Sequence, residues 1–308
     1  MENRRLGILF LVSLGLCGAC SENPESMAVP ASGGREHIPT QSTSDAGAPS
    51  KKYVALGSSF AAGPKIPDAV PDQSCGRSTG NYAHLVAADL GLDLTDASCI
   101  GATIDNIATT PQSMNPLQLA AVTPDTAVIT ITIGGNDVSY STSLNACGLA
   151  GMNGMSCLET RAGAAAPDVD SADIDNRLAQ EADKLVAMLS QLKQAAPAAR
   201  VYLVAYPQIL PDPAVVCPPD VPMQVADATF LGKVGMKLQA TFTSAAAVAG
   251  VTFVDLYAAS HGHDACAPAD QRWVEGQANA SVAAYHPNPA GMRAAADLIV
   301  AAIQKDAR

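Results

Sequence analysis

The chain has 308 residues, of which 48% are hydrophobic and 15% are charged, so it can bury a large core and is not a wholly disordered protein. Aromatic residues make up only 4%, and the Ala-rich apolar fraction favours closely packed helices over a β-sandwich. The formal net charge is −11. Nucleic acid is excluded as a partner, because binding phosphates needs a concentrated basic face and the sequence has none.

The N-terminus has the pattern of an export signal. Arg4 and Arg5 precede an apolar run over residues 6–12, and this run leads to small residues that end at Cys20. Such a run is too short for a transmembrane helix, which needs about 20 apolar residues. We therefore predict a signal peptide over residues 1–19.

Residues 16–20 are similar to a bacterial lipobox, in which the last Cys is lipidated and becomes the new N-terminus. Cys17 is a departure, since such boxes usually carry Leu there. A lipoprotein anchored to a membrane through Cys20 and a freely secreted protein both remain open. Residues 20–50 contain no Leu and no aromatic residue, so we expect a disordered tether before one domain over residues 51–308.

Six cysteines follow the signal, and in an exported protein an even number indicates three disulfides. Zinc ligation is disfavoured, because it usually needs closely spaced pairs and these cysteines are dispersed. The sequence alone leaves all fifteen pairings open. The six are Cys75, Cys99, Cys147, Cys157, Cys217 and Cys266.

Short segments rich in apolar and β-branched residues alternate with helical patterns over the rest of the chain. The expected strands cover residues 53–57, 93–98, 126–133, 201–206 and 251–257. The clearest helices cover residues 174–192, 227–249 and 289–305. In the first of them Leu178, Ala182, Leu185 and Leu189 recur at helical spacing, and Asn288 and Pro289 mark the start of the last. This alternation predicts an α/β fold with a mostly parallel sheet, whose functional sites lie beyond the carboxyl ends of the strands.

Four motifs stand at or near those strand ends. Ser59 follows the first strand in a Gly-Ser-Ser turn, Gly101 follows the second, and Asn136 follows the third in a Gly-Gly-Asn-Asp turn. His286 stands in a His-Pro pair just before the last helix. Each motif alone is more often structural than functional, since Gly-rich turns and single histidines are common.

Together and in this order, the four motifs resemble the SGNH/GDSL hydrolase family over about residues 53–304. In detail the chain is similar to the secreted, disulfide-containing actinobacterial-type esterases of that family. The resemblance implies a three-layer α/β/α, flavodoxin-like fold with a five-stranded sheet, and three disulfides between sequence neighbours. It also implies ester hydrolysis through an acyl-enzyme without metal or cofactor, and we expect a monomer.

Residue by residue, the resemblance makes Ser59 the nucleophile and His286 the general base. The Ser59 N–H, the Gly101 N–H and the Asn136 amide would form the oxyanion hole. The chemistry needs this set, because a serine hydroxyl must lose its proton to attack an ester. The negative charge that develops on the carbonyl oxygen then needs well-aimed donors.

The chain departs from the family pattern at two positions. Ser58 replaces the usual Asp before the nucleophile, and Ala283 replaces the Asp that usually stands three residues before the histidine. In the similar esterases a main-chain carbonyl replaces that carboxylate, so we expect the Ala283 carbonyl to accept from His286 Nδ1–H and fix its tautomer. Asp255 and Asp264 remain alternative acceptors.

Two other functions are compatible with parts of the sequence. His261 and His263 could contribute to a metal site, but no third ligand is evident. The missing carboxylate at Ala283 would suit a non-catalytic surface lipoprotein that binds glycan. Nucleotide binding is excluded because no phosphate-binding glycine motif follows a strand. The substrate is expected to be an acyl ester, a lipid or an acetylated glycan, and the acidic charge disfavours anionic lipid.

Overall fold

The computed structural model describes residues 50–308, apart from residues 72–73, 161–172 and 279–281. The predicted signal peptide, the tether before residue 50 and Cys20 lie outside the described residues. No helix among the described residues combines the length and the apolar character needed to cross a membrane.

A five-stranded sheet with the strand order β2-β1-β3-β4-β5 forms the centre of the fold, and every neighbouring pair of strands is parallel. The strands are β1 (Lys52–Gly57), β2 (Asp93–Asp96), β3 (Val128–Thr132), β4 (Arg200–Val204) and β5 (Thr252–Val254). Nearly every residue of β1 and β3 is buried, as expected for strands that helices cover on both faces. The predicted parallel α/β sheet is confirmed.

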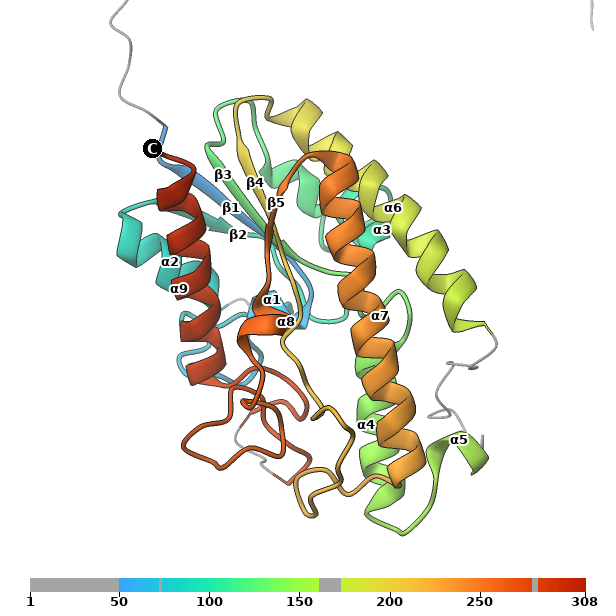
Figure 1. The fold of residues 1–308 in the computed structure, drawn as a ribbon. Coiled ribbons are helices and arrows are strands. Elements are labelled where there is room, and N and C mark those ends of the chain that lie inside the picture. The colour runs from blue at the N-terminus through green and yellow to red at the C-terminus, as the bar shows by residue number, and fades with distance from the viewer. Residues whose placement is uncertain (1–49, 72–73, 161–172, 279–281) are drawn as a thin grey trace, which may run out of the picture. The chain divides into compact units, whose positions relative to one another are not determined.

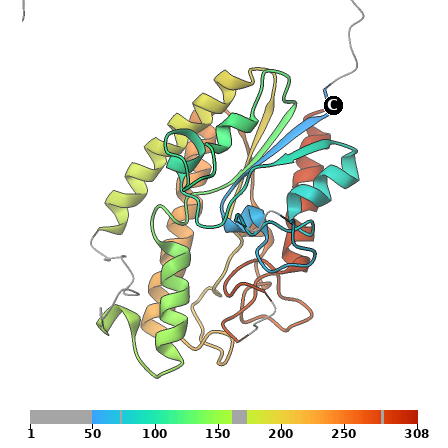
Figure 2. The same ribbon diagram turned by 180° about the vertical axis from the view of Figure 1, so that it is seen from behind.

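Helices form a layer on each face of the sheet (Figures 1 and 2). One layer consists of α2 (Tyr82–Leu90) and α9 (Pro289–Lys305), and the other of α3 (Ile104–Ala108), α6 (Ile174–Ala195) and α7 (Val225–Ala249). The remaining helices are α1 (Ser59–Ala62), the 3₁₀ helix η1 (Gln118–Ala121), α4 (Tyr140–Gly151), α5 (Cys157–Thr160) and α8 (Leu256–Ala259). The three-layer α/β/α fold is therefore confirmed.

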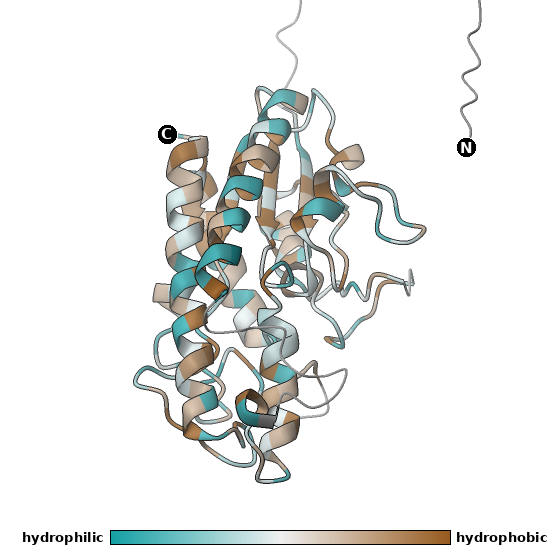
Figure 3. Ribbon diagram, turned by 90° about the vertical axis from the view of Figure 1, so that its right-hand side faces the viewer, coloured by the Kyte–Doolittle hydropathy of each residue, from teal (hydrophilic) through white to brown (hydrophobic). Residues whose placement is uncertain are grey.

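The long helices are amphipathic, and Figure 3 shows polar and apolar residues alternating along them. Helix α6 buries Leu178, Leu185 and Leu189, as the spacing predicted. It also buries Glu181, whereas Ala182, which the pattern assigned to the buried face, is only half-buried. A carboxyl group thus lies on the apolar face of the helix.

Four of the five strands end earlier than predicted, and at β2 and β5 polar side chains bond to the backbone just beyond the strand. The last strand stops at Val254, since the Asp255 side chain accepts from the Ala258 N–H at 2.9 Å and begins α8. Strand β2 stops at Asp96, whose carboxylate accepts from the Ser98 N–H at 3.0 Å.

The six cysteines form three disulfides between neighbours in sequence, as the resemblance implied. The bonds are Cys75–Cys99, Cys147–Cys157 and Cys217–Cys266. The first of them fixes the segment that leads from β2 to Gly101. The pairing itself could not have been derived from the cysteine spacing.

The end of β1 is fixed by one buried side chain and one close backbone approach. Gln118 accepts from the Gly57 N–H at 2.8 Å and donates to the Gly57 carbonyl at 3.0 Å. Gly57 has a φ of 139°, and a Cβ atom there would lie 2.3 Å from the Thr132 carbonyl oxygen. Only glycine fits this position, and the residue two places later is Ser59.

Candidate active site

Ser59 is the first residue of α1 and lies directly beyond the carboxyl end of β1. The preceding Ser58 N–H donates to the Thr132 carbonyl at 2.9 Å, which ties this turn to β3. As the first residue of a helix, Ser59 has no intrahelical acceptor for its own N–H. Ser59 is buried, with 7% of the residue exposed.

His286 comes from the segment before α9 and meets Ser59 from the other end of the chain. Main-chain bonds pair this segment with Glu275: the Tyr285 N–H donates to the Glu275 carbonyl, and the Glu275 N–H donates to the His286 carbonyl. The Asn288 side chain caps α9 and donates to the Glu275 carboxylate at 3.0 Å. These contacts place His286 Nε2 at 2.8 Å from Ser59 Oγ.

The other ring nitrogen, Nδ1, lies 2.8 Å from the carbonyl oxygen of Ala284. A carbonyl can only accept, so Nδ1 carries the hydrogen and Nε2 accepts from the Ser59 hydroxyl. The expectation for Ala283 is wrong. Its carbonyl accepts from the His286 main-chain N–H at 3.2 Å, because the left-handed Tyr285 (φ 56°) closes a turn there and leaves the Ala284 carbonyl beside the ring.

The two carboxylates considered as alternative acceptors have other partners. Asp255 caps α8 and also accepts from the Gln239 side chain at 2.7 Å. Asp264 accepts from the Cys266 N–H at 2.8 Å. Neither forms a hydrogen bond with His286 in the described structure.

The His-x-His pair is not gathered into a ligand cluster. The His263 ring stacks on Trp273 with centroids 4.2 Å apart, and His261 packs edge-on against Tyr257. Among the described residues, the one group of possible ligand atoms close enough for an ion comprises Cys147, Cys157 and Asp227. Its two sulfur atoms are joined in a disulfide.

The surroundings of His286 favour its neutral form. The residue is 8% exposed, and its ring stacks on that of Phe60 with centroids 4.5 Å apart. Burial lowers the pKa of His286, and the hydrogen bond to the Ala284 carbonyl partly opposes this shift. The imidazole is therefore uncharged near neutral pH and able to accept a proton.

Two side chains join the turn of Gly101 to the turn of Asn136. Asn136 Nδ2 donates to the Ala102 carbonyl at 2.9 Å. Both oxygens of the Asp137 carboxylate accept from the Ile104 N–H, at 3.1 and 3.2 Å. These bonds fix the spacing between the segments after β2 and β3, and the sequence analysis did not predict this role of Asp137.

The backbone N–H groups of Ser59 and Gly101 have no acceptor among the residues that the structure describes. Gly101 has a φ of 74°, in the left-handed region that glycine adopts readily. The Asn136 amide uses one bond to Ala102 and has a second N–H to offer. These three groups remain available as donors to a bound oxygen.

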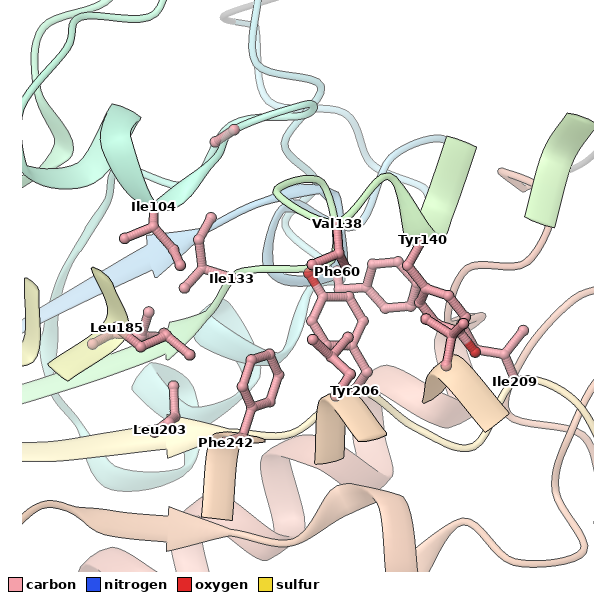
Figure 4. Close-up of a cluster of buried hydrophobic side chains, with 14 of the residues drawn as sticks. Phe60, Ile104, Ile133, Val138, Tyr140, Leu185, Leu203, Tyr206, Ile209 and Phe242 are labelled. Carbon is pink, nitrogen blue, oxygen red and sulfur yellow. The ribbon is translucent and has the colours of Figure 1, made fainter. Parts of the chain in front are cut away.

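Tyr206, just beyond the end of β4, links the first and third motifs and was missed from the sequence. Its hydroxyl accepts from the Gly135 N–H at 3.0 Å and lies 3.3 Å from Ser58 Oγ. Its ring packs against Phe60, with centroids 4.4 Å apart, and close to Phe242 (Figure 4). The available signal was an aromatic residue with a hydroxyl at the site-bearing edge of the sheet.

Residues 55–294 match the GDSL-like lipase/acylhydrolase family. The chain belongs to this family. It is 34% identical over 256 residues to Lipase 2 of Streptomyces coelicolor, a match that covers 81% of this chain and 84% of that protein. This relationship makes the GDSL-family protein a carboxylic ester hydrolase.

Two solved structures share the fold of this GDSL-family hydrolase. The phospholipase A1 from Streptomyces albidoflavus NA297 superposes with a TM-score of 0.63 at 23% identity. The extracellular lipase from Streptomyces rimosus superposes with a TM-score of 0.60 at 25% identity. Each match covers 81% of this chain and 97% of the other.

Replacing the Tyr206 hydroxyl tests whether it fixes the Asn136 turn. Tyr206→Phe leaves the buried Gly135 N–H without a partner, so the free energy of unfolding should fall by about 1–3 kcal/mol. Urea unfolding followed by circular dichroism measures this loss. Ser58→Ala removes only the longer contact and should cost less. Equal losses in the two variants would contradict the assignment.

Proposed function

We propose that this ester hydrolase works through an acyl-enzyme, with Ser59 as nucleophile and His286 as general base. The observation that supports this most is the 2.8 Å hydrogen bond between Ser59 Oγ and His286 Nε2. A serine hydroxyl bonded to a neutral imidazole is the arrangement that nucleophilic catalysis requires. The non-catalytic glycan-binding alternative gives no reason for such a pair.

The reaction follows from these two groups. As Ser59 Oγ bonds to the ester carbonyl carbon, His286 Nε2 takes the hydroxyl proton, and the carbonyl electron pair moves onto its oxygen. Collapse of this tetrahedral intermediate breaks the bond to the alkoxide, which leaves with the proton from Nε2. Water then attacks the acyl-enzyme and gives a proton to His286. Collapse of this second tetrahedral intermediate breaks the bond to Ser59 Oγ, which takes the proton back from Nε2 as the acid is released.

The oxyanion hole is proposed to consist of the Ser59 N–H, the Gly101 N–H and the Asn136 side-chain amide. Their spacing is supported by the bonds from Asn136 to Ala102 and from Ile104 to Asp137. Fixed donors of this kind stabilise the charge that appears only in the transition state, because they need no reorganisation when the reaction occurs.

The Ala284 carbonyl is proposed to orient His286 in place of the usual carboxylate. It accepts from Nδ1–H and so keeps Nε2 free of hydrogen in the resting enzyme. When the imidazolium forms, the carbonyl dipole stabilises the positive charge on the ring. A carbonyl has no full negative charge, which is consistent with the lowered pKa of His286.

For the substrate class we propose acyl esters of lipid, because the relative with 34% identity is named a lipase. We further propose that the protein is exported. Three disulfides and the signal pattern of residues 1–19 support export, since such bonds persist in oxidising compartments. Lipidation at Cys20 is one way in which the exported protein could be held at a membrane.

A serine-directed phosphonate tests the nucleophile. The wild-type protein should be labelled stoichiometrically, and Ser59→Ala should remove both the label, as seen by intact mass, and the hydrolysis of p-nitrophenyl esters. Ser58→Ala is the matched control and should keep the label. Labelling that persists in Ser59→Ala would contradict the assignment. A wild type that is never labelled would favour the glycan binder.

The pH profile of kcat/KM tests the base. Only neutral His286 can accept the proton, so kcat/KM should rise with pH and reach its plateau once the residue is deprotonated. Because burial lowers the pKa of His286, the acid midpoint should lie below its usual value of 6.5. Initial rates over a range of about pH 4 to 8 measure this midpoint. A midpoint above 6.5 would rule out this environment for the base.

Removing the Asn136 amide tests the oxyanion hole. Asn136→Ala should lower kcat on the order of 10²-fold to 10³-fold with little change in KM, because the donor acts mainly in the transition state. Asn153→Ala, which removes another amide bonded to a carbonyl on an exposed helix end, should leave kcat unchanged. An Asn136→Ala variant whose KM rises while its kcat is unchanged would argue against an oxyanion role.

A further inference from the structure

A buried carboxyl group lies directly against the turn that carries Asn136. Glu181, on α6, is 2% exposed. A Cβ atom on Gly134 would lie 2.1 Å from Glu181 Oε1 and 3.0 Å from the ring of Phe242. The carboxyl group therefore fills the space that a side chain at position 134 would need, and Gly134 has a φ of 109°.

Glu181 forms no hydrogen bond or ion pair in the described structure, although Arg177 and Lys184 lie near enough to oppose the rise of its pKa. Neither Oε1 nor Oε2 has a hydrogen-bond partner there. The nearby cations on the same helix are bonded elsewhere: Arg177 donates to the Asp137 carbonyl at 3.1 Å, and Lys184 pairs with Asp105 at 2.7 Å. A buried carboxylate without donors is costly, so these surroundings favour the protonated acid.

The neighbouring carboxyl group, Asp137, is better suited to carry a charge. It accepts from the Ile104 N–H, although burial raises its pKa to about 6. Burial, followed by repulsion from Asp137, holds the pKa of Glu181 well above its usual range. Two adjacent buried acids avoid ionising together, so Asp137 takes the charge and Glu181 keeps the proton.

The titratable and charged groups around Glu181 come from every element packed against it. The turn after β3 provides Asp137, α3 provides Asp105 beyond Lys184, and the end of β4 provides Tyr206. Burial raises the pKa of Tyr206, so its hydroxyl stays protonated. Helix α7 contributes the uncharged ring of Phe242.

We propose that Glu181 is a positioning residue for the oxyanion hole. As a neutral acid it supports the turn over residues 134–137 and thereby the Asn136 amide. Its ionisation at alkaline pH draws the carboxylate toward water, displaces this turn and lowers kcat. The inference rests on the proposed role of Asn136, and it adds an alkaline limit to the acid limit set by His286.

Two substitutions of Glu181 test whether a neutral side chain of this size supports the turn over residues 134–137. Glu181→Ala should lower kcat at neutral pH on the order of 10-fold to 100-fold, because small displacements of a catalytic donor are costly. Glu181→Gln, neutral and equal in size, should recover that loss and move the alkaline midpoint of kcat upward by about one pH unit or more. The acid midpoint should stay fixed in both.

Asp183→Asn is the matched control, since it removes one carboxylate from the exposed side of the same helix. It should change neither limb of the profile. An alkaline limb that is identical in the wild type and in Glu181→Gln would overturn the proposal. So would a kcat in Glu181→Gln as low as that in Glu181→Ala.

Thermal unfolding gives a readout that does not depend on catalysis. The folded-state pKa of Glu181 is raised, so its contribution to stability is complete below the ordinary value of 4.5 and is lost as pH rises toward the folded value. The melting temperature of Glu181→Gln minus that of the wild type should therefore grow from pH 4.5 upward. A difference that is constant with pH would overturn the proposal.

The two proposals fail in distinguishable ways. If Asn136→Ala keeps full kcat while the melting difference still grows with pH, the oxyanion role is wrong and the protonated Glu181 stands. If Glu181→Gln does not fold, infrared spectra of the wild type at pH 8 should still show the C=O stretch of a protonated carboxyl. Asp137 does not contribute to this band, because it is ionised at that pH. Absence of that band would overturn the proposal.

Discussion

The hydrogen bond between Ser59 Oγ and His286 Nε2 is the contact on which the proposed chemistry depends, and it joins residues 227 positions apart. Each end is fixed by its own contacts. Gln118 and the close approach at Gly57 hold the serine end, and the pairing with Glu275 holds the histidine end. Because hydrogen bonds to the backbone fix both ends, the 2.8 Å distance between Ser59 Oγ and His286 Nε2 is set by the positions of the two backbone segments.

The strand order explains why the remaining motifs gather around this contact. β1 lies between β2 and β3, and β4 follows β3, so the segments after four successive strands of the sheet open at one edge. Side chains then join these segments crosswise. Tyr206 connects the turns after β1 and β3, and Asp137 connects the turns after β2 and β3. The site is a set of loops held by one another rather than by a single element.

Sequence reasoning found the sheet, the long helices and the residues of the pair, because each has a local signature. Asn288 and Pro289 marked the start of α9, and the spacing of leucines marked α6. It failed where a contact depends on backbone geometry or on tertiary packing. The left-handed conformation of Tyr285 places the Ala284 carbonyl, and not that of Ala283, beside His286 Nδ1. Residue propensities do not predict this conformation. α4 has small polar residues without clear periodicity, and the importance of Glu181 appears only once Gly134 lies against it.

The order of the pair along the chain has a consequence for biosynthesis. Among the described residues, the serine begins the first helix, α1, whereas the histidine precedes the last helix, α9. With the roles proposed for Ser59 and His286, a polypeptide that ends before His286 holds the alcohol without its base. The proposed chemistry therefore becomes possible only after nearly the whole chain has been made and folded.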